Sequence, residues 1–142
     1  CLRFFTVYGP RQRPDMAIHK FTRMIAEGRE IEMYGDGTSR RDYTYVADII
    51  EGIHNAIHHC QGYHIYNLGE SQTTQLKELI ALIEKTLGKK AVIKQCPMQP
   101  GDVNTTFADI SQAKHDIGYT PSVPVETGIP QFVEWFLKTH NS

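Results

Sequence analysis

The sequence lacks the features that mark several large classes of protein. Its three cysteines, Cys1, Cys60 and Cys96, are widely spaced and form no Cys-x-x-Cys pair, which argues against a zinc site or a redox dithiol. We therefore expect a reducing, cytoplasmic location. No apolar run approaches the ~20 residues needed to cross a bilayer, and no basic-then-apolar signal opens the chain, so we expect no membrane partner. The chain starts inside an apolar run without a methionine, which suggests a piece of a longer protein.

The chain also lacks an excess of charge of either sign. The 142 residues include 15 Lys and Arg against 16 Asp and Glu, a formal net charge of -1. This balance gives no long-range field that would attract nucleic acid, so any bound anion must be held by local arginines. The hydrophobic fraction of 40% is sufficient for the core of one domain.

Hydrophobic periodicity predicts strands that alternate with helices. We expect strands at residues 2–8, 31–34, 42–46, 63–68 and 91–95, and helices at 15–28, 47–59, 74–87, 109–118 and 127–140. The first strand should be buried, and the caps of three helices should be Asp15, Thr73 or Thr74, and Asp109. With no internal repeat or linker, the pattern indicates one α/β unit, but without enough strand-helix pairs for a complete doubly wound sheet.

The densest polar cluster lies at residues 35–43, where a Gly-Asp-Gly turn leads to Arg40 and Arg41 at the head of a strand. Planar guanidinium groups can each give two parallel hydrogen bonds to phosphate, which makes the cluster suitable for a diphosphate. Equally compatible is a solvated hairpin whose arginines pair with nearby acids, namely Asp36, Asp42 or Asp48. A dinucleotide fingerprint is excluded, because Arg40 occupies the third glycine position and no helix is predicted to open there.

Three smaller groups of polar residues each have a structural and a functional interpretation. Residues 11–13, Arg-Gln-Arg, precede a helix and could hold a carboxylate or simply form a basic surface loop. Asp102, in a Gln-Pro-Gly-Asp turn, could accept hydrogen bonds from sugar hydroxyls or close an Asx-turn. His54, His58 and His59 lack a third ligand at useful spacing, so we expect a solvated helix face and no metal site.

Catalytic residues are not evident in this chain. A tyrosine followed four positions later by lysine would form the acid-base pair of a short-chain dehydrogenase, but none of the seven tyrosines has this spacing. We therefore predict no catalytic residue and no cofactor-binding residue here.

The order of several segments resembles the end of extended short-chain dehydrogenases, in the NAD-dependent epimerase/dehydratase family, and is most similar to bacterial UDP-glucuronate 4-epimerases. The matching segments are residues 2–10, 13–16, 34–37, 40–43, 101–103 and 108–109. The resemblance implies that residues 1–142 are the C-terminal substrate-binding lobe of a Rossmann-type fold, with the N-terminal dinucleotide-binding half absent. Residues 1–8 would then be a strand of the parent sheet.

The resemblance also implies a UDP-sugar, UDP-glucuronate in particular, as the partner. The resemblance implies that Arg41 binds the diphosphate, that the segment around Glu32 and Tyr34 lines the uracil, and that Asp102 binds the ribose. It also implies that Thr6 and Arg13 contact the sugar, with Arg13 suited to the glucuronate carboxylate. Gln99 departs from galactose epimerases, which tend to carry an arginine there, and this puts a second phosphate clamp in doubt.

The reaction implied for the complete protein is NAD-dependent oxidation at C4 of the sugar, rotation of the 4-keto intermediate and return of the hydride to its opposite face. This chain alone should be inactive. A UDP-glucuronate decarboxylase and a dTDP-glucose 4,6-dehydratase share the Gly-Asp-Gly and Arg-Asp-aromatic segments and stay open as alternatives. A non-catalytic nucleotide-sugar-binding module is a further alternative, from another class of protein. An exposed edge of the first strand could also pair two copies into a homo-oligomer.

Overall fold

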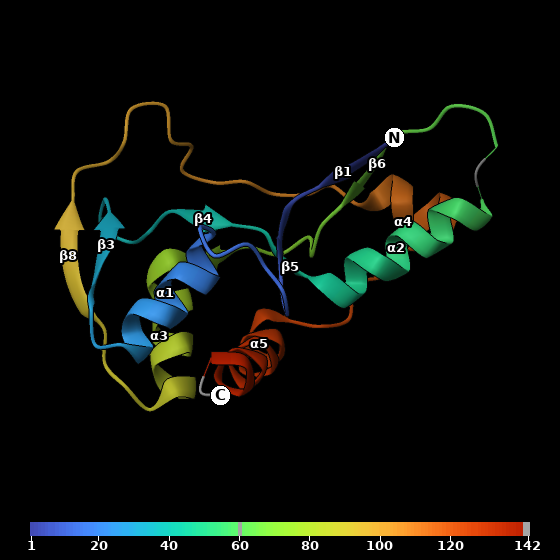
Figure 1. Ribbon diagram of the computed structural model, residues 1–142. Coiled ribbons are helices and arrows are strands. Elements are labelled where there is room, and N and C mark those ends of the chain that lie inside the picture. The colour runs from blue at the N-terminus through green and yellow to red at the C-terminus, as the bar shows by residue number, and fades with distance from the viewer. Residues whose placement is uncertain (60, 141–142) are drawn as a thin grey trace.

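Strands and helices alternate along most of the chain (Figure 1). The structure is a computed structural model that describes residues 1–59 and 61–140, so Cys60 lies outside the described residues. The strands are β1 (Leu2–Phe4), β2 (Thr6–Tyr8), β3 (Glu30–Tyr34), β4 (Arg40–Arg41), β5 (Tyr43–Tyr45), β6 (Tyr66–Leu68), β7 (Thr74–Gln75) and β8 (Val92–Cys96). The helices are α1 (Ala17–Ala26), α2 (Val46–His58), α3 (Leu76–Leu87), α4 (Ser111–Ile117) and α5 (Val125–His140). The expected α/β class is confirmed.

The strands pair two by two instead of forming one broad sheet. β1 pairs with β6, β2 with β5 and β3 with β8, all in parallel, whereas β4 and β7 are antiparallel. Parallel partners need a long crossover between them, and helices lie within each of these crossovers. β4 and β7 were not predicted, because two residues are too few for an alternating pattern to show.

The predicted strand at residues 2–8 is divided in two by a change of partner. β1 pairs with β6 in the register Leu2 to Tyr66. The backbone N–H of Phe5 still donates to the Leu68 carbonyl at 3.1 Å, whereas that of Thr6 donates to the Asp42 carbonyl at 3.1 Å. Beyond this point β2 runs alongside β5.

The expectation that this first strand is buried is wrong for most of its length. Tyr8 is buried, but Arg3 and Phe4 are exposed, and 49% of the Phe4 surface is accessible. A strand paired on one side only, in a two-stranded sheet, leaves its other edge and much of its face to solvent.

The main hydrophobic core lies between α1, α3 and α5, which gather in one part of the molecule, with β5 close by (Figure 1). α3 buries Leu79, Ile80 and Ile83, as its apolar stripe predicts, while Leu82 is only partly buried. α5 contributes Ile129 and Phe132, and other members of the core are Ile18, Ile25, Ile31 and Tyr43.

A second, smaller core joins α2, α4 and β6. Gly52 of α2 lets Leu68 and Tyr119 approach its backbone, because a Cβ at this position would lie 2.9 Å from Leu68 and 2.8 Å from Tyr119. The hydroxyl of Tyr119 donates to the Gly69 carbonyl at 3.0 Å, which ties the second core to the loop that follows β6.

None of the three predicted cap residues occupies the N-cap position. The residue that caps α1 is Met16, without a side-chain hydrogen bond, because the Asp15 carboxylate is taken up by Arg13. The cap of α3 is Gln75, not Thr73 or Thr74, and its backbone N–H donates to Glu78 Oε2 at 2.9 Å. Before α4, Asp109 Oδ1 does accept a hydrogen bond from the Ser111 N–H at 3.0 Å, although Ile110 stands at the cap position itself.

Candidate functional site

Five of the six predicted site residues line one pocket of about 240 Å³. They come from separate parts of the chain: Thr6 from β2, Glu32 and Tyr34 from β3, Arg41 from β4, and Asp102 from the turn after β8. The pocket is completed by Gln12, Met16, Ala17, Ile18, Phe21, Ser39, Tyr43 and Leu76. A small polar set on a mostly apolar wall is the usual composition of a site for an organic ligand.

Arg41 and Asp102 form an ion pair at this pocket. Arg41 Nη2 donates to Asp102 Oδ1 at 2.5 Å, and Arg41 Nη1 donates to the Arg40 carbonyl at 2.9 Å. The Arg41 side chain is only 22% exposed, so its charge acts in a partly desolvated position where charge-assisted bonds are stronger. The hairpin alternative, in which the arginines pair with Asp36, Asp42 or Asp48, is wrong for Arg41.

Arg40 has a structural role beside it. Its Nε donates to Thr73 Oγ1 at 2.8 Å and its Nη2 to the Thr73 carbonyl at 2.7 Å, which joins β4 to the segment before β7. Of the two adjacent arginines, only Arg41 therefore presents its guanidinium to this pocket.

Asp42 holds the backbone around this strand in place. The residue is fully buried, and its carboxylate accepts hydrogen bonds from the N–H groups of Glu70 (2.8 Å), Ser71 (3.1 Å) and Ala108 (3.1 Å) and from the Thr44 hydroxyl (3.0 Å). One carboxylate thus fixes two distant loops against the strand that carries Arg41.

The two β3 residues lie on the same side of their strand because they are two positions apart. The Tyr34 hydroxyl donates to Glu32 Oε2 at 3.2 Å, which orients both side chains along the pocket wall. Alternation also places Tyr43 on the pocket side with Arg41. Burial raises the pKa of Tyr43 to about 12, with the Arg41 charge opposing the shift, so its phenol stays neutral.

Arg13, the sixth predicted residue, lies outside this pocket. It lines an adjacent pocket of about 420 Å³, which shares Thr6, Gln12 and Met16 with the first. Its side chain is 75% exposed and donates to the Asp15 carboxylate from Nε at 3.1 Å and from Nη2 at 2.5 Å. An exposed pair of this kind is weakly held, so the guanidinium can turn toward a ligand anion.

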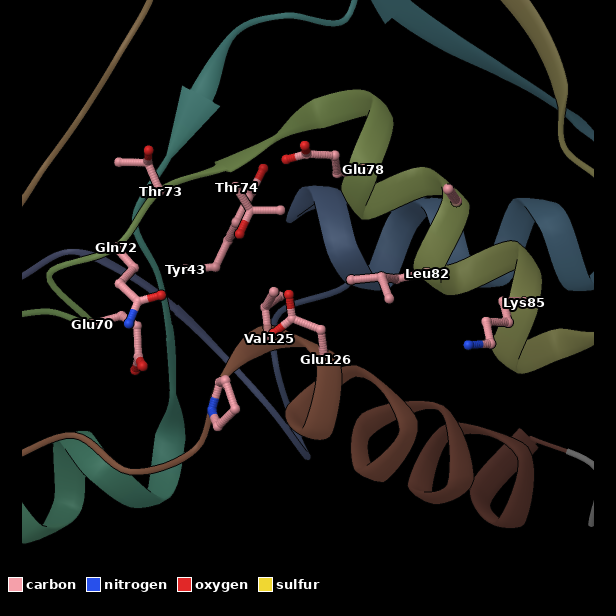
Figure 2. A pocket seen from close by; sticks show the side chains of 12 residues that line it. Tyr43, Glu70, Gln72, Thr73, Thr74, Glu78, Leu82, Lys85, Val125 and Glu126 are labelled. Carbon is pink, nitrogen blue, oxygen red and sulfur yellow. The ribbon is translucent and has the colours of Figure 1, made fainter.

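Another pocket, of about 460 Å³, contains none of the six predicted residues (Figure 2). Glu78 and Lys85 reach it from α3, Glu126 comes from α5, and Glu70 lies across from them in the loop after β6. The acidic side chains on this wall outnumber its single ammonium group, which makes it unfavourable for a diphosphate. The smaller pocket with Arg41 is the better candidate on electrostatic grounds.

Glu70 is a half-buried acid that the sequence analysis did not single out. Burial, assisted by the charges of Asp48, Asp42 and Glu126, raises its pKa to about 7. Its Oε2 atom is buried without a hydrogen-bond partner among the described residues. No pattern in the sequence signals this, because the surrounding acids come from three other segments.

Gln12 and Tyr43 also line the candidate pocket; they lie in the polar clusters at residues 11–13 and 35–43 but were not among the six predicted site residues. The signal for Tyr43 was available, since it stands two positions after Arg41 on an extended segment. Gln12 carried no such signal, because its position follows from the backbone of the loop before α1.

The histidines of α2 stand apart from these pockets. His54 and His58 share one hydrogen bond between their Nε2 atoms at 3.1 Å. Within residues 1–59 and 61–140, no group of three or more His, Cys, Asp or Glu side chains is arranged to hold a metal ion. Over the same residues no helix combines the length and the apolar composition needed to span a membrane.

Comparison with known proteins gives one consistent result. The model of the NAD dependent epimerase/dehydratase family matches residues 1–69. Over 96% of its length the chain is 50% identical to an uncharacterized protein, MJ1055, of Methanocaldococcus jannaschii. It is 39% identical, over 94% of its length, to a UDP-glucuronate 4-epimerase of Thermodesulfobacterium geofontis. The chain spans 42% of the length of each of these two relatives.

Solved structures agree with the sequence relatives. UDP-glucuronic acid 4-epimerase from Bacillus cereus, in complex with UDP-glucuronic acid and NAD, matches 98% of this chain with a TM-score of 0.88 and 34% identity. UDP-glucose 4-epimerase from Thermotoga maritima, with UDP-glucose, matches 97% with a TM-score of 0.86 and 35% identity. In both cases the chain covers 45% of the solved protein.

Proposed function

Because this chain belongs to the NAD-dependent epimerase/dehydratase family, we propose that it forms the UDP-sugar-binding part of a UDP-glucuronate 4-epimerase, an isomerase that forms UDP-galacturonate. The observation that carries the proposal is the pocket in which Arg41 and Asp102 face each other. A cation for a diphosphate and a carboxylate for hydroxyl groups are the two polar features that a nucleoside diphosphate requires.

Arg41 is the residue proposed to hold the diphosphate. Its pair with Asp102 keeps the guanidinium at the pocket, and its planar fork can give two parallel hydrogen bonds to phosphate oxygens. Asp102 would then turn its oxygens to the ribose hydroxyls, which are good donors to a carboxylate. The ion pair is therefore proposed to be exchanged, on binding, for contacts with the ligand.

The uracil is proposed to lie along β3, beside Glu32 and Tyr34. This wall of the pocket combines the backbone of a strand with apolar neighbours such as Phe21 and Leu76. A planar base needs such a surface together with a few hydrogen-bonding groups at its edge.

The sugar is proposed to extend from this pocket into the adjacent one. Thr6 lines both pockets, and Arg13 lines the second. Arg13 can exchange its exposed contact with Asp15 for the carboxylate of glucuronate. This arrangement favours an acidic sugar, since a neutral hexose would leave Arg13 without a new partner.

The glycine-rich turn at residues 35–37 does not fit the pyrophosphate of NAD. The Gly35–Gly37 turn leads into β4 instead of a helix N-terminus, and Asp36 is exposed on it, where it would repel a pyrophosphate. We therefore propose that NAD and the catalytic residues belong to another part of the complete protein, and that this chain alone binds substrate without turning it over. The share of the relatives' length that the chain covers is consistent with this division.

The domain boundaries are part of the same proposal. Residues 1–142 would form the substrate-binding domain, with residues 1–8 completing a sheet supplied by the rest of the protein. The exposed Phe4 and the unpaired edge of β1, as seen among the described residues, support this assignment. In isolation the same edge could pair two copies of the chain. A reducing, cytoplasmic location is also part of the proposal.

The test uses the full-length protein and compares UDP-glucuronate with UDP-glucose. Arg41→Ala should weaken both UDP-sugars alike, because the diphosphate is common to them. Arg13→Ala should lower kcat/KM for UDP-glucuronate by about 10 to 100-fold, equivalent to ~1.4–2.8 kcal/mol, and change UDP-glucose far less. Arg29→Ala is the matched control, since Arg29 is 61% exposed and pairs only with Glu27 among the described residues.

Two results would contradict the proposal. If the wild-type protein bound neither UDP-sugar in a calorimetric titration, the pocket would not be a nucleotide-sugar site. If Arg13→Ala lowered kcat/KM equally for both sugars, Arg13 would not read the carboxylate, and glucuronate would be withdrawn as the preferred substrate.

A further inference from the structure

The loop that carries Arg13 has an unusual backbone. Arg11 adopts a φ of 66°, a left-handed conformation that is uncommon for a residue with a side chain. Gly9, at the start of the loop, has a φ of 142°, and a Cβ there would lie 2.5 Å from Val46. Such a backbone persists only where surrounding contacts hold it in place.

Gln12 supplies the first set of these contacts. Its backbone N–H donates to the Gly9 carbonyl at 3.1 Å, and its side-chain Nε2 donates to the Val7 carbonyl at 2.9 Å. The residue lines both the Arg41 pocket and the Arg13 pocket. Gln12 therefore stands at the junction across which the sugar would extend.

His19 supplies a further contact from the core, in addition to the hydrogen bond from the Met16 N–H to the Arg13 carbonyl at 3.2 Å. The side chain lies in α1 and is only 4% exposed. Its Nδ1 lies 2.8 Å from the Gln12 carbonyl oxygen. Because a carbonyl only accepts hydrogen bonds, Nδ1 must carry the proton and donate it. The ring thus links the sugar-facing loop to the body of the protein.

The ring of His19 is itself held in one orientation by α5. Phe132, Trp135, Phe136 and His140 surround it, all edge to face, with ring centroids at 5.7, 6.0, 5.5 and 5.7 Å. Edge-to-face packing of this kind fixes the plane of a ring, and therefore the direction of its N–H. Arg13 directly follows Gln12, whose carbonyl is held in place by His19. The Arg13 side chain itself makes an exposed contact with Asp15.

We propose that His19 is a positioning residue for the sugar end of the substrate: its Nδ1–H holds the Gln12 carbonyl, and this sets where Arg13 begins its reach toward the sugar. The inference rests on the proposed function. It assigns His19 no contact with the ligand. Loss of the hydrogen bond frees the loop, so a ligand that reaches the loop binds more weakly, whereas UDP, which lacks the sugar, is unaffected.

The test compares His19→Phe with His19→Asn in the full-length protein. Phenylalanine fills the aromatic site but cannot donate, whereas the amide of asparagine can place an N–H near the position of Nδ1. Titration calorimetry gives Kd for UDP and for UDP-glucuronate. His19→Phe should raise Kd for UDP-glucuronate by about threefold to tenfold, the range expected for one lost hydrogen bond, and leave Kd for UDP unchanged. His19→Asn should recover most of this loss.

Each other outcome has a distinct meaning. If the wild-type protein bound UDP but not UDP-glucuronate, or neither, the proposed function itself would fail. If the wild type bound both and His19→Phe left both Kd values unchanged, or raised them equally, His19 would be a packing residue only. Equal losses in the phenylalanine and asparagine variants would likewise overturn the role of the hydrogen bond.

Discussion

Asp42→Asn is the substitution that most directly tests how the site is held together. Four donors converge on the Asp42 carboxylate: the Glu70 N–H and the Thr44 hydroxyl on Oδ1, and the Ser71 and Ala108 N–H groups on Oδ2. Asparagine has nearly the same shape, but one of its terminal atoms donates instead of accepting. The change therefore removes acceptors without opening a cavity.

The expected loss follows from counting donors. The Thr44 hydroxyl can rotate and accept from the new NH₂ group, but a backbone N–H cannot, so at least one buried or partly buried amide faces another donor. A buried unsatisfied donor costs about 1–3 kcal/mol, and hydrogen bonds to a neutral oxygen are weaker than those to a carboxylate. Removing a buried charge offsets part of this. We expect the free energy of unfolding to fall by about 2–4 kcal/mol.

Urea denaturation of the chain, followed by circular dichroism, measures that free energy, and amide hydrogen exchange locates the change. The N–H protons of Glu70, Ser71 and Ala108 should exchange faster in the variant. The control is Asp36→Asn at an exposed turn, where an amide oxygen can still accept from the Thr38 N–H. If both variants lost less than about 0.5 kcal/mol, or if the three amides exchanged as before, the reasoning would be refuted, because surface changes alone produce effects of that size.

Two further predictions concern stability. The pKa of Glu70 in the folded chain is raised to about 7 from an ordinary 4.5, so the folded form holds this proton more tightly; stability should fall as pH rises through that interval and level off above it. Glu70→Gln should remove that pH dependence and raise stability at pH 8, because it removes a charge that burial disfavours. The gain should be only on the order of 1 kcal/mol, because solvent screens a half-exposed group. A variant no more stable than wild type by thermal melting at pH 8 would count against this prediction. Leu79→Ala should lower the free energy of unfolding by about 2–5 kcal/mol, since Leu79 is fully buried in the main core; a loss below about 1 kcal/mol in urea would show that α3 is not anchored there.

Much of the fold could be predicted because its signals are local. The stripe of α3 shows in the spacing of Leu79 and Ile83, and Gly88, with a φ of 65°, ends that helix as glycine commonly does. The predicted cap residues were wrong where a distant or neighbouring group binds the side chain that would have capped the helix, as Arg13 binds Asp15. The division of the first strand at Phe5 could not be foreseen, because it depends on which later strand lies beside each half.

The candidate site was predictable only as separate motifs. The pattern around Arg41 suggested a phosphate site, and the turn at Asp102 suggested hydroxyl binding, but their contact at 2.5 Å joins positions 61 residues apart. Binding by the six predicted residues stays a prediction. The spatial neighbours of Glu70 and the contact of His19 with the Gln12 carbonyl depend on tertiary structure, to which spacing along the sequence gives no access.

The parallel pair β3–β8 has a consequence for biosynthesis. Its partners are about 60 residues apart in the chain, as Glu30 pairs with Val92. A ribosome that adds ~5–20 residues per second leaves β3 without its partner for about 3–12 s. During that interval the strand presents unpaired N–H and C=O groups, which is the state most open to association with other nascent chains. Slower translation through residues 35–92 should therefore favour chaperone dependence and aggregation more than slower translation after Cys96.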